Sequence, residues 1–284
     1  MAEIVGAFGL PHNPHFPSWS AAGHPLAAEI DRFYGELAER LAAVEPEALI
    51  YITSDHYNMF FETVPLFAIG VAEAAAGPSD YPEIPRRELP IDAALARYLD
   101  RWLVDAEFDV AMLQELEFDH TVIAPLGFVW PGEPIPLVPL FISAFLRPIA
   151  SARRCFALGR TIREALAARD EGPQRIAVIA SGSFSVEIGG PRLFPDAHVG
   201  VPAPEWTERV VELLGAGDFE TLVAEATDEQ LREAGNAGGE VLDWIAMLGM
   251  IDPAAPEVIE TQPQFGHSYA AWPIDRAAGT EARA

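Results

Sequence analysis

The stretch Ala48-Leu49-Ile50-Tyr51-Ile52-Thr53-Ser54-Asp55-His56 decides the fold. Its first six residues form an apolar run that is long enough for a buried strand. An earlier apolar run, residues 4–10, ends at Pro11. The chain between the two runs predicts a long amphipathic helix that ends near Pro46, because apolar residues recur at steps of three and four: Leu26, Ile30, Phe33, Leu37 and Leu41. Strand, helix and strand in this order are typical of a βαβ unit with parallel strands.

The remaining sequence continues this alternation of strands and helices. We expect strands at 64–71, 108–113, 134–143 and 175–180, helices at 91–105, 155–169, 204–214, 228–234 and 240–250, and a loop rich in proline and charge over 77–90. No repeat or linker divides the 284 residues, so we predict one domain, 1–284, with a flexible tail from Gly279. The predicted class is α/β, with a mostly parallel or mixed central sheet and helices on both faces.

Composition limits the partners of this chain. The net charge is -25, from 43 acidic and 18 basic residues, and such a field repels phosphate backbones, so no nucleic-acid partner is expected. The sequence shows no apolar run of about 18 residues, and its start lacks the pattern of a signal peptide, so no membrane partner is expected. The only cysteine, Cys155, fits a cytoplasmic location and is expected to be packed.

Candidate functional residues follow the predicted strands. Ligands gather at the carboxyl ends of strands in α/β sheets, and His12, His56 and the turn at Gly182 each lie just beyond such an end. Glu240 stands at a predicted helix start. Two imidazoles and one carboxylate suit non-haem ferrous iron.

Each of these residues also has a plainer interpretation. His12 shares its loop with His15, and His24 lies nearby, and the pattern does not rank the three. His56 could belong to a solvated turn, and Glu240 could simply complement a helix dipole. The polar turn at 181–185 could bind a small anion or could be only a turn. Neither a nucleotide-binding glycine loop, nor a His-Glu-x-x-His zinc helix, nor a serine nucleophile elbow is present.

Several segments resemble one family in their order and spacing. They are the loop at His12, Tyr51–His56, Pro65–Gly70, Phe118-Asp119-His120, Arg154–Gly159, Gly189-Gly190-Pro191-Arg192 and Gly239–Trp244. Together they resemble the catalytic subunits of class III extradiol ring-cleavage dioxygenases, the LigB-like superfamily of the protocatechuate 4,5-dioxygenase beta subunit. The resemblance implies Fe(2+) held by His12, His56 and Glu240, with His120 beside the oxygen pocket. It further implies a small aromatic substrate, O2, and a homo-oligomer or a hetero-oligomer with a small subunit.

One position departs from the family pattern. Members usually carry a Ser-His pair whose histidine is the acid–base catalyst, whereas this chain has Ser185-Val186. Valine cannot move a proton, so we expect either that another histidine takes over or that the substrate needs less help because its hydroxyl is more acidic or it carries an amine. The candidates for this proton transfer are His120, His198 and His267. Ser183, Ser185 and Val186 are expected to line the substrate site.

The sequence therefore predicts an iron(II)-dependent extradiol-type dioxygenase that cleaves a catechol-like or aminophenol-like ring with a variant acid–base site. Two alternatives remain open at this point. One is a non-catalytic partner subunit of a ring-cleavage dioxygenase, which the missing histidine would explain. The other is a superfamily member that uses its metal for chemistry without O2.

Overall fold

The structure is a computed structural model that describes residues 1–195 and 197–274. The tail that we expect to be flexible from Gly279 lies outside these ranges. A mixed central sheet runs through the protein. The strands of the sheet are β1 (Glu3–Leu10), β2 (Ala48–Thr53), β3 (Phe67–Gly70), β6 (Ala111–Leu113), β7 (Leu137–Ile142), β8 (Arg175–Ser181), β11 (Val258–Gln262) and β12 (His267–Pro273). Their order is β11-β12-β1-β8-β2-β7-β3-β6.

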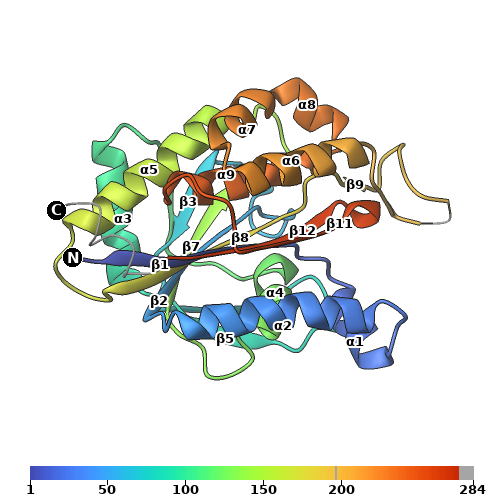
Figure 1. Ribbon diagram of the computed structural model, residues 1–284. Helices are drawn as coiled ribbons and strands as arrows, with labels where there is room; N and C mark the ends of the chain where they lie inside the picture. The colour runs from blue at the N-terminus through green and yellow to red at the C-terminus, as the bar shows by residue number, and fades with distance from the viewer. Residues whose placement is uncertain (196, 275–284) are drawn as a thin grey trace.

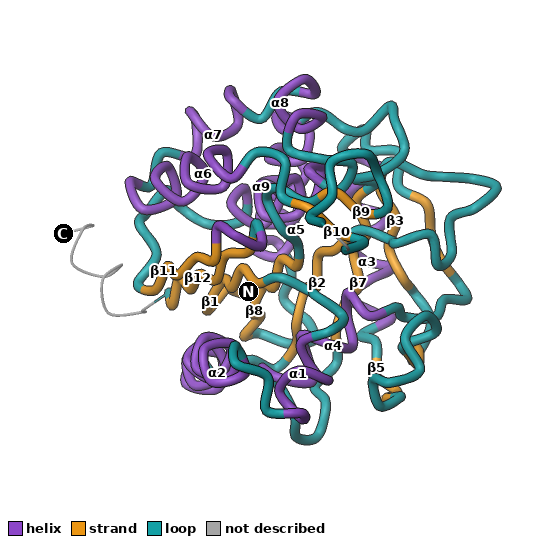
Figure 2. Tube along the Cα trace, turned by 90° about the vertical axis from the view of Figure 1, so that its right-hand side faces the viewer, coloured by secondary structure: helices purple, strands orange, loops and turns teal. Residues whose placement is uncertain are grey.

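Helices cover both faces of this sheet (Figures 1 and 2). One face carries α3 (Ala93–Asp105), α5 (Ala152–Ala168), α6 (Pro204–Ala216), α7 (Phe219–Glu225), α8 (Asp228–Glu233) and α9 (Val241–Gly249). The other face carries α1 (Phe16–Ala22), α2 (Ala27–Ala43) and α4 (His120–Val129). This arrangement confirms the predicted α/β class. Of the helices in the described part of the chain, none has the length and apolar character that a bilayer span requires.

The central strands are apolar along their whole length because both of their faces are buried. The sheet has one hydrophobic core on each face. In β2, Ile50 and Ile52 belong to the core between the sheet and helices α5 and α9, whereas Leu49 and Tyr51 belong to the core between the sheet and helices α2 and α4. All four side chains are at most 2% exposed. The run at residues 48–53 therefore forms the buried strand that its composition predicts.

The topology differs from the expected βαβ unit in one respect. β1 and β2 are parallel, but β8 lies between them and pairs with both. β7 continues the parallel set beside β2, whereas β3 runs antiparallel to β7 and β12 antiparallel to β1. The sheet is thus parallel at its centre and mixed toward its edges.

Several local predictions need correction. The strand expected at 64–71 is limited to β3, and the loop expected at 77–90 is bordered by two short strands, β4 (Ala74–Gly77) and β5 (Arg87–Pro90), which pair with each other. The helix expected from residue 91 begins at Ala93, because the Asp92 side chain caps it by accepting from Leu95 N at 2.8 Å. The sequence analysis placed no helix at α1 or α7 and no strand at β11 or β12.

Helices α5 and α9 approach each other closely because glycine lies at their contact. A Cβ atom built on Gly159 would lie 1.9 Å from the carbonyl oxygen of Ala246, which is backbone and cannot move aside. A Cβ on Gly249 would similarly lie 2.2 Å from the carbonyl oxygen of Phe156. The close contact fixes the position of α9, the helix that follows Glu240.

Gly159→Ala is therefore expected to lower the free energy of unfolding by about 1–3 kcal/mol or more, because the methyl group overpacks a backbone contact. The matched control is Gly35→Ala in α2, where a Cβ would meet nothing within 4 Å. That variant should gain up to about 1 kcal/mol from helix propensity. Urea unfolding followed by circular dichroism measures both, and equal effects of the two substitutions would contradict the close-contact account.

Candidate metal centre

The loops after three adjacent parallel strands bring the polar residues together. His12 follows β1, Ser183 follows β8, and His56 follows β2, and these strands are neighbours in the order β1-β8-β2. Their carboxyl ends open at one edge of the sheet, where open α/β sheets bind ligands. Glu240 reaches the same point from the one-turn 3-10 helix η1 (Gly238–Glu240) that precedes α9.

A glycine allows this approach between η1 and the loop after β8. A Cβ atom on Gly182 would lie 2.8 Å from the Cβ of Glu240 and 3.0 Å from its carbonyl oxygen. The backbone carbonyl of Gly182 also accepts a hydrogen bond from the Trp244 indole N–H at 3.1 Å, which connects the loop to the first turns of α9. The absence of a side chain at this residue therefore lets the carboxylate enter the site.

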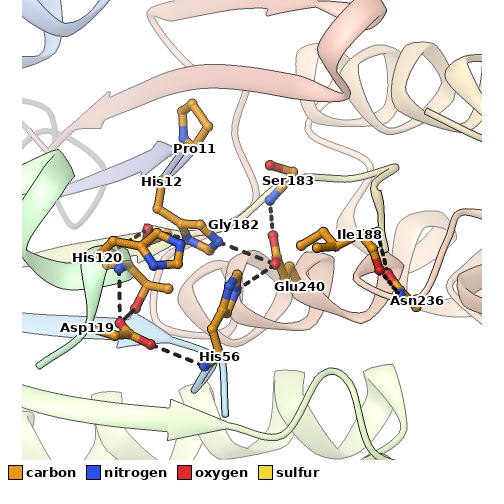
Figure 3. A network of polar contacts seen from close by, with 12 residues as sticks. Pro11, His12, His56, Asp119, His120, Gly182, Ser183, Ile188, Asn236 and Glu240 are labelled. Carbon is orange, nitrogen blue, oxygen red and sulfur yellow. Dashed lines mark hydrogen bonds and ion pairs between the residues drawn. The ribbon is translucent and has the colours of Figure 1, made fainter. Parts of the chain in front are cut away.

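Two imidazoles converge on one carboxylate oxygen (Figure 3). His12 Nε2 lies 3.3 Å and His56 Nε2 3.1 Å from Glu240 Oε1. The other oxygen, Oε2, accepts the backbone N–H of Ser183 at 2.7 Å. His12 and Glu240 are 4% and 2% exposed, so this contact is shielded from water. The three residues that the family resemblance assigns to iron thus meet in space.

The hydrogen bonds of Ser181 determine which His12 nitrogen is free. The Ser181 hydroxyl donates to the carbonyl of Thr121 at 3.1 Å, so it accepts from His12 Nδ1–H at 2.9 Å. The second nitrogen, Nε2, then carries a lone pair that faces the Glu240 carboxylate. Such an arrangement is repulsive unless a proton or a cation lies between the two groups.

The distances fit a metal ion. Ligand atoms bonded at about 2.1 Å and at right angles around a divalent metal lie about 3 Å apart. The separations of 3.1 and 3.3 Å from Glu240 Oε1 match this spacing. The fixed Nδ1–H of His12 also orients the ring as the outer hydrogen bonds of metal-binding histidines usually do.

The charges of Glu240, His12 and His56 affect one another's pKa values. Burial raises the pKa of Glu240, but the charges of His12 and His56 and their hydrogen bonds to it outweigh this and hold its pKa below the ordinary range. Burial lowers the pKa of His56, and its contact with Glu240 reverses the effect and raises the pKa. A cation that binds here must displace a proton from this cluster.

His120 lies beside this cluster at the start of α4. Its ring centroid is 4.8 Å from that of His56 and 5.7 Å from that of His12. Nδ1 bonds to the Asp80 carboxylate, which also accepts the His120 backbone N–H at 3.0 Å. Burial lowers the pKa of His120 although Asp80 opposes the shift. The ring is therefore neutral near pH 7, with its proton on Nδ1.

The ligand nitrogens of His12, His56 and His120 lie within 4.8 Å of one another. His120 is nevertheless hydrogen-bonded to a carboxylate of its own, whereas His12 and His56 share Glu240. Asp119 supports this corner by accepting His56 N at 3.1 Å and Thr121 N at 2.9 Å, which caps α4.

A cavity of about 490 Å³ opens above the histidine cluster and contains some of the other predicted site residues. Ser183, Val186 and His267 line it. His267 is buried with no hydrogen-bond partner at Nδ1, and burial lowers its pKa to about 3.

Two other predicted site residues do not line this cavity. The Ser185 hydroxyl accepts Ala203 N at 2.9 Å inside the protein. His198 is exposed at the surface, and its carbonyl accepts Gly189 N at 2.9 Å.

The sequence analysis did not single out several residues at the site. Asp80 lies in a Pro-rich loop, and nothing in the local pattern marks it as the partner of His120. Trp19 and Phe265 line the cavity from segments that are distant in the chain. Asp119 had a usable signal, because an Asp before an apolar run is a typical helix cap.

Asp243 lies one helical turn after Glu240 and is fully buried. Neither carboxylate oxygen has a hydrogen-bond partner, and burial raises its pKa well above the ordinary value, with Glu240 adding to the shift. This carboxyl is therefore held in its neutral form, because an unpaired buried charge is very costly.

The fold is α/β, and the histidine–carboxylate group at the edge of its sheet could hold a metal ion. The family model described as the catalytic LigB subunit of aromatic ring-opening dioxygenase matches residues 6–271. The chain therefore belongs to this family, and the resemblance read from its sequence is confirmed.

Individual relatives are more distant. A 2,3-dihydroxyphenylpropionate/2,3-dihydroxicinnamic acid 1,2-dioxygenase of Cupriavidus necator is 26% identical over 269 residues, 81% of this chain and 84% of the relative. Gallate dioxygenase of Pseudomonas putida is 29% identical over 184 residues, 64% of this chain and 50% of that protein. The crystal structure of an uncharacterized protein of Escherichia coli K12 shares the fold, with a TM-score of 0.56 at 17% identity, and covers 94% of this chain and 98% of its own.

Asp243→Asn is expected to raise the free energy of unfolding of the metal-free protein at pH 7 by about 1–3 kcal/mol. Because the folded pKa of Asp243 is raised, its carboxyl favours folding only below the unfolded pKa near 4, and this contribution is lost as the pH rises. The gain should therefore shrink between pH 7 and pH 4. Urea unfolding at both values measures it, and a variant that is less stable than the parent at pH 7 would contradict the assignment of a neutral, unpaired carboxyl.

Proposed function

We propose that this protein is an iron(II)-dependent extradiol-type dioxygenase that cleaves a catechol-like or aminophenol-like ring with O2. One observation carries the proposal: two imidazole nitrogens lie 3.3 and 3.1 Å from one oxygen of Glu240 at the wall of a cavity of about 490 Å³. Two histidines and a carboxylate on one side of a metal suit non-haem iron(II) and leave positions open for other ligands. The cavity volume suits a small aromatic molecule.

The family and its named members support the same reaction class. The Cupriavidus necator relative is named for a 2,3-dihydroxy aromatic acid, so a ring with neighbouring hydroxyl groups is the expected substrate type here. We further expect a homo-oligomer or a hetero-oligomer with a small subunit, and a cytoplasmic location, as the sequence analysis did.

The chain would hold the metal through His12 Nε2, His56 Nε2 and Glu240 Oε1. Iron(II), when bound, supplies the Lewis acidity and the electron transfer that ring opening by O2 requires. The protein fixes the direction of two of these side chains: Ser181 holds His12 Nδ1 at 2.9 Å, and Ser183 N–H holds the second Glu240 oxygen at 2.7 Å. These contacts leave His12 Nε2 and Glu240 Oε1 free to hold a metal.

We assign the proton transfer to His120. Its Nδ1 is bonded to Asp80, so Nε2 is the free nitrogen that accepts a proton from a substrate hydroxyl. The Asp80 carboxylate stabilises the imidazolium that results. His267 lines the same cavity, but no acid is bonded to it and burial lowers its pKa to about 3. Val186, which the family resemblance places at the usual position of the catalytic histidine, also lines the cavity and offers only an apolar side chain.

The first test is anaerobic reconstitution with Fe(II), followed by O2 and a panel of catechols and aminophenols. The expected result is one iron per chain and a yellow ring-fission product from at least one compound. Glu240→Ala and His56→Ala should each lose stoichiometric iron, because each removes a ligand of a three-ligand site. Absorbance spectroscopy and metal analysis provide the readouts, and an iron-loaded protein that opens none of the rings would count against the proposal.

The second test separates the two buried histidines of the cavity. His120→Gln is expected to lower kcat by about 10²–10⁴-fold while iron content is unchanged, whereas His267→Gln should change kcat by less than about 10-fold. In the parent protein kcat should fall as the pH is lowered, because His120 becomes protonated and can no longer accept a proton. Asp80→Asn removes a contact that raises the pKa of His120, so the acid limb should move to lower pH. A larger loss in His267→Gln would transfer the role to that residue.

Val186 also favours a second candidate function, a non-catalytic partner subunit. Metal content decides between the two, because a partner subunit would have no need to bind iron, whereas the enzyme must hold it. A member that uses its metal without O2 would instead retain activity under anaerobic conditions and after substitution by zinc.

A further inference from the structure

We propose that the substrate of this site is an uncharged catechol or aminophenol that carries an apolar substituent, and that anionic aromatics are disfavoured. This inference rests on the proposed function and specifies its substrate class. It is carried by the chemistry of the cavity wall and by the positions of the arginines in the described chain.

The cavity wall is largely aromatic and aliphatic. Away from the histidine cluster, the apolar part of the wall includes side chains from five separate segments: Trp19, Tyr81, Phe145, Phe194 with Val199, and Phe265. Val186 adds an apolar surface near Ser183 and Glu240. A ring substituent that extends from the histidine cluster toward solvent must pass over these side chains, and its burial against them is favourable only if it is apolar.

The mouth of the cavity exposes apolar side chains that the fold leaves uncovered. Ile188, Phe194 and Val199 are 41%, 40% and 39% exposed, and all three line the cavity. They belong to one ribbon, in which β9 (Glu187–Ile188) pairs with β10 (Val199–Gly200). Exposed apolar side chains gathered in this way mark a surface that binds an apolar group.

No arginine or lysine side chain lines this cavity among the residues that the structure describes. Two carboxylates, Glu240 and Asp80, place negative charge at its wall. The whole chain carries a net charge of -25 and contains no lysine. A carboxylate on the substrate would lose water there and find no ion pair in return.

Arginines near the site are occupied elsewhere. Arg192 lies next to the ribbon, but its Nη2 is 2.7 Å from the Glu187 carboxylate and its Nη1 donates to the carbonyl of Glu233 at 2.8 Å. Arg154, in the first turn of α5, stacks over the ring of Phe67 at 5.3 Å from its centroid and does not line the cavity. These guanidinium groups are held by other partners and do not enter the cavity wall.

The test compares two ligands that differ in one charge: 3-(2,3-dihydroxyphenyl)propionate and its methyl ester. At pH 8, where an ordinary histidine is neutral, kcat/KM of the iron-loaded protein is expected to be at least about 100-fold higher for the ester. Equal use of the two, or preference for the acid, overturns the inference. Cleavage of neither compound, nor of any other catechol or aminophenol, counts against the proposed function instead.

Anaerobic calorimetry of the same pair keeps the inference testable if no ring is opened. Tighter binding of the ester supports an uncharged substrate. Equal affinity, tighter binding of the acid, or no binding of either compound overturns it.

A matched pair of charge variants locates the effect. Ile188→Arg places a cation at the mouth, on a backbone that Asn236 holds through hydrogen bonds of 2.9 and 2.8 Å. This variant should shift the acid-to-ester ratio of kcat/KM by about 10-fold or more toward the acid. Val104→Arg in α3 adds the same charge at a residue that is 54% exposed and does not line the cavity, so it should leave the ratio unchanged. Equal shifts in both variants, or no shift in Ile188→Arg, would contradict the role of the cavity wall.

Discussion

The convergence of two imidazole nitrogens on one carboxylate oxygen is the constraint on which the candidate site depends. The lone pair of His12 Nε2 faces Glu240 Oε1 at 3.3 Å, because the proton of the ring is on Nδ1 and is donated to the Ser181 hydroxyl. Lone pairs that face each other in a buried site repel, and only a proton or a cation relieves this repulsion. The fold holds His12 and Glu240 in this arrangement through hydrogen bonds to Ser181 and Ser183.

The packing of α9 makes this arrangement possible. Gly159 and Gly249 let α5 and α9 touch through their backbones, and Gly182 lets the segment before α9 approach the loop after β8. Glu240 lies late in the sequence, but its carboxylate therefore reaches the ends of the first two strands, β1 and β2. A shift of this helix by one ångström would separate the ligand atoms, and this is why the site depends on core packing as much as on its polar residues.

The chemistry of the cavity follows from a division between polar floor and apolar wall. His12, His56, His120 and Glu240 form the floor, where Asp80 and Ser183 satisfy the remaining polar atoms. The wall carries aromatic rings and Val186, and among the described residues it holds no arginine or lysine side chain. Water exclusion by such a wall strengthens each electrostatic contact on the floor, and the same wall selects against charged substituents.

The sequence by itself determined the α/β class, the buried central strands, the family, and the residue types of the candidate site, because these depend on local periodicity and on short motifs. Residues 48–53 form the predicted strand, and the predicted histidine, His56, follows in the loop after it. The sequence did not determine the insertion of β8 between β1 and β2, or the antiparallel pair β11 and β12, because strand pairing depends on contacts between distant segments. Only the tertiary structure decided that His12, and neither His15 nor His24, faces Glu240, and that His267 lines the cavity while His198 lies at the surface. The physical reason is that a site of this kind is defined by distances between side chains of remote loops, and these distances are fixed by how the helices pack on the sheet rather than by any local pattern.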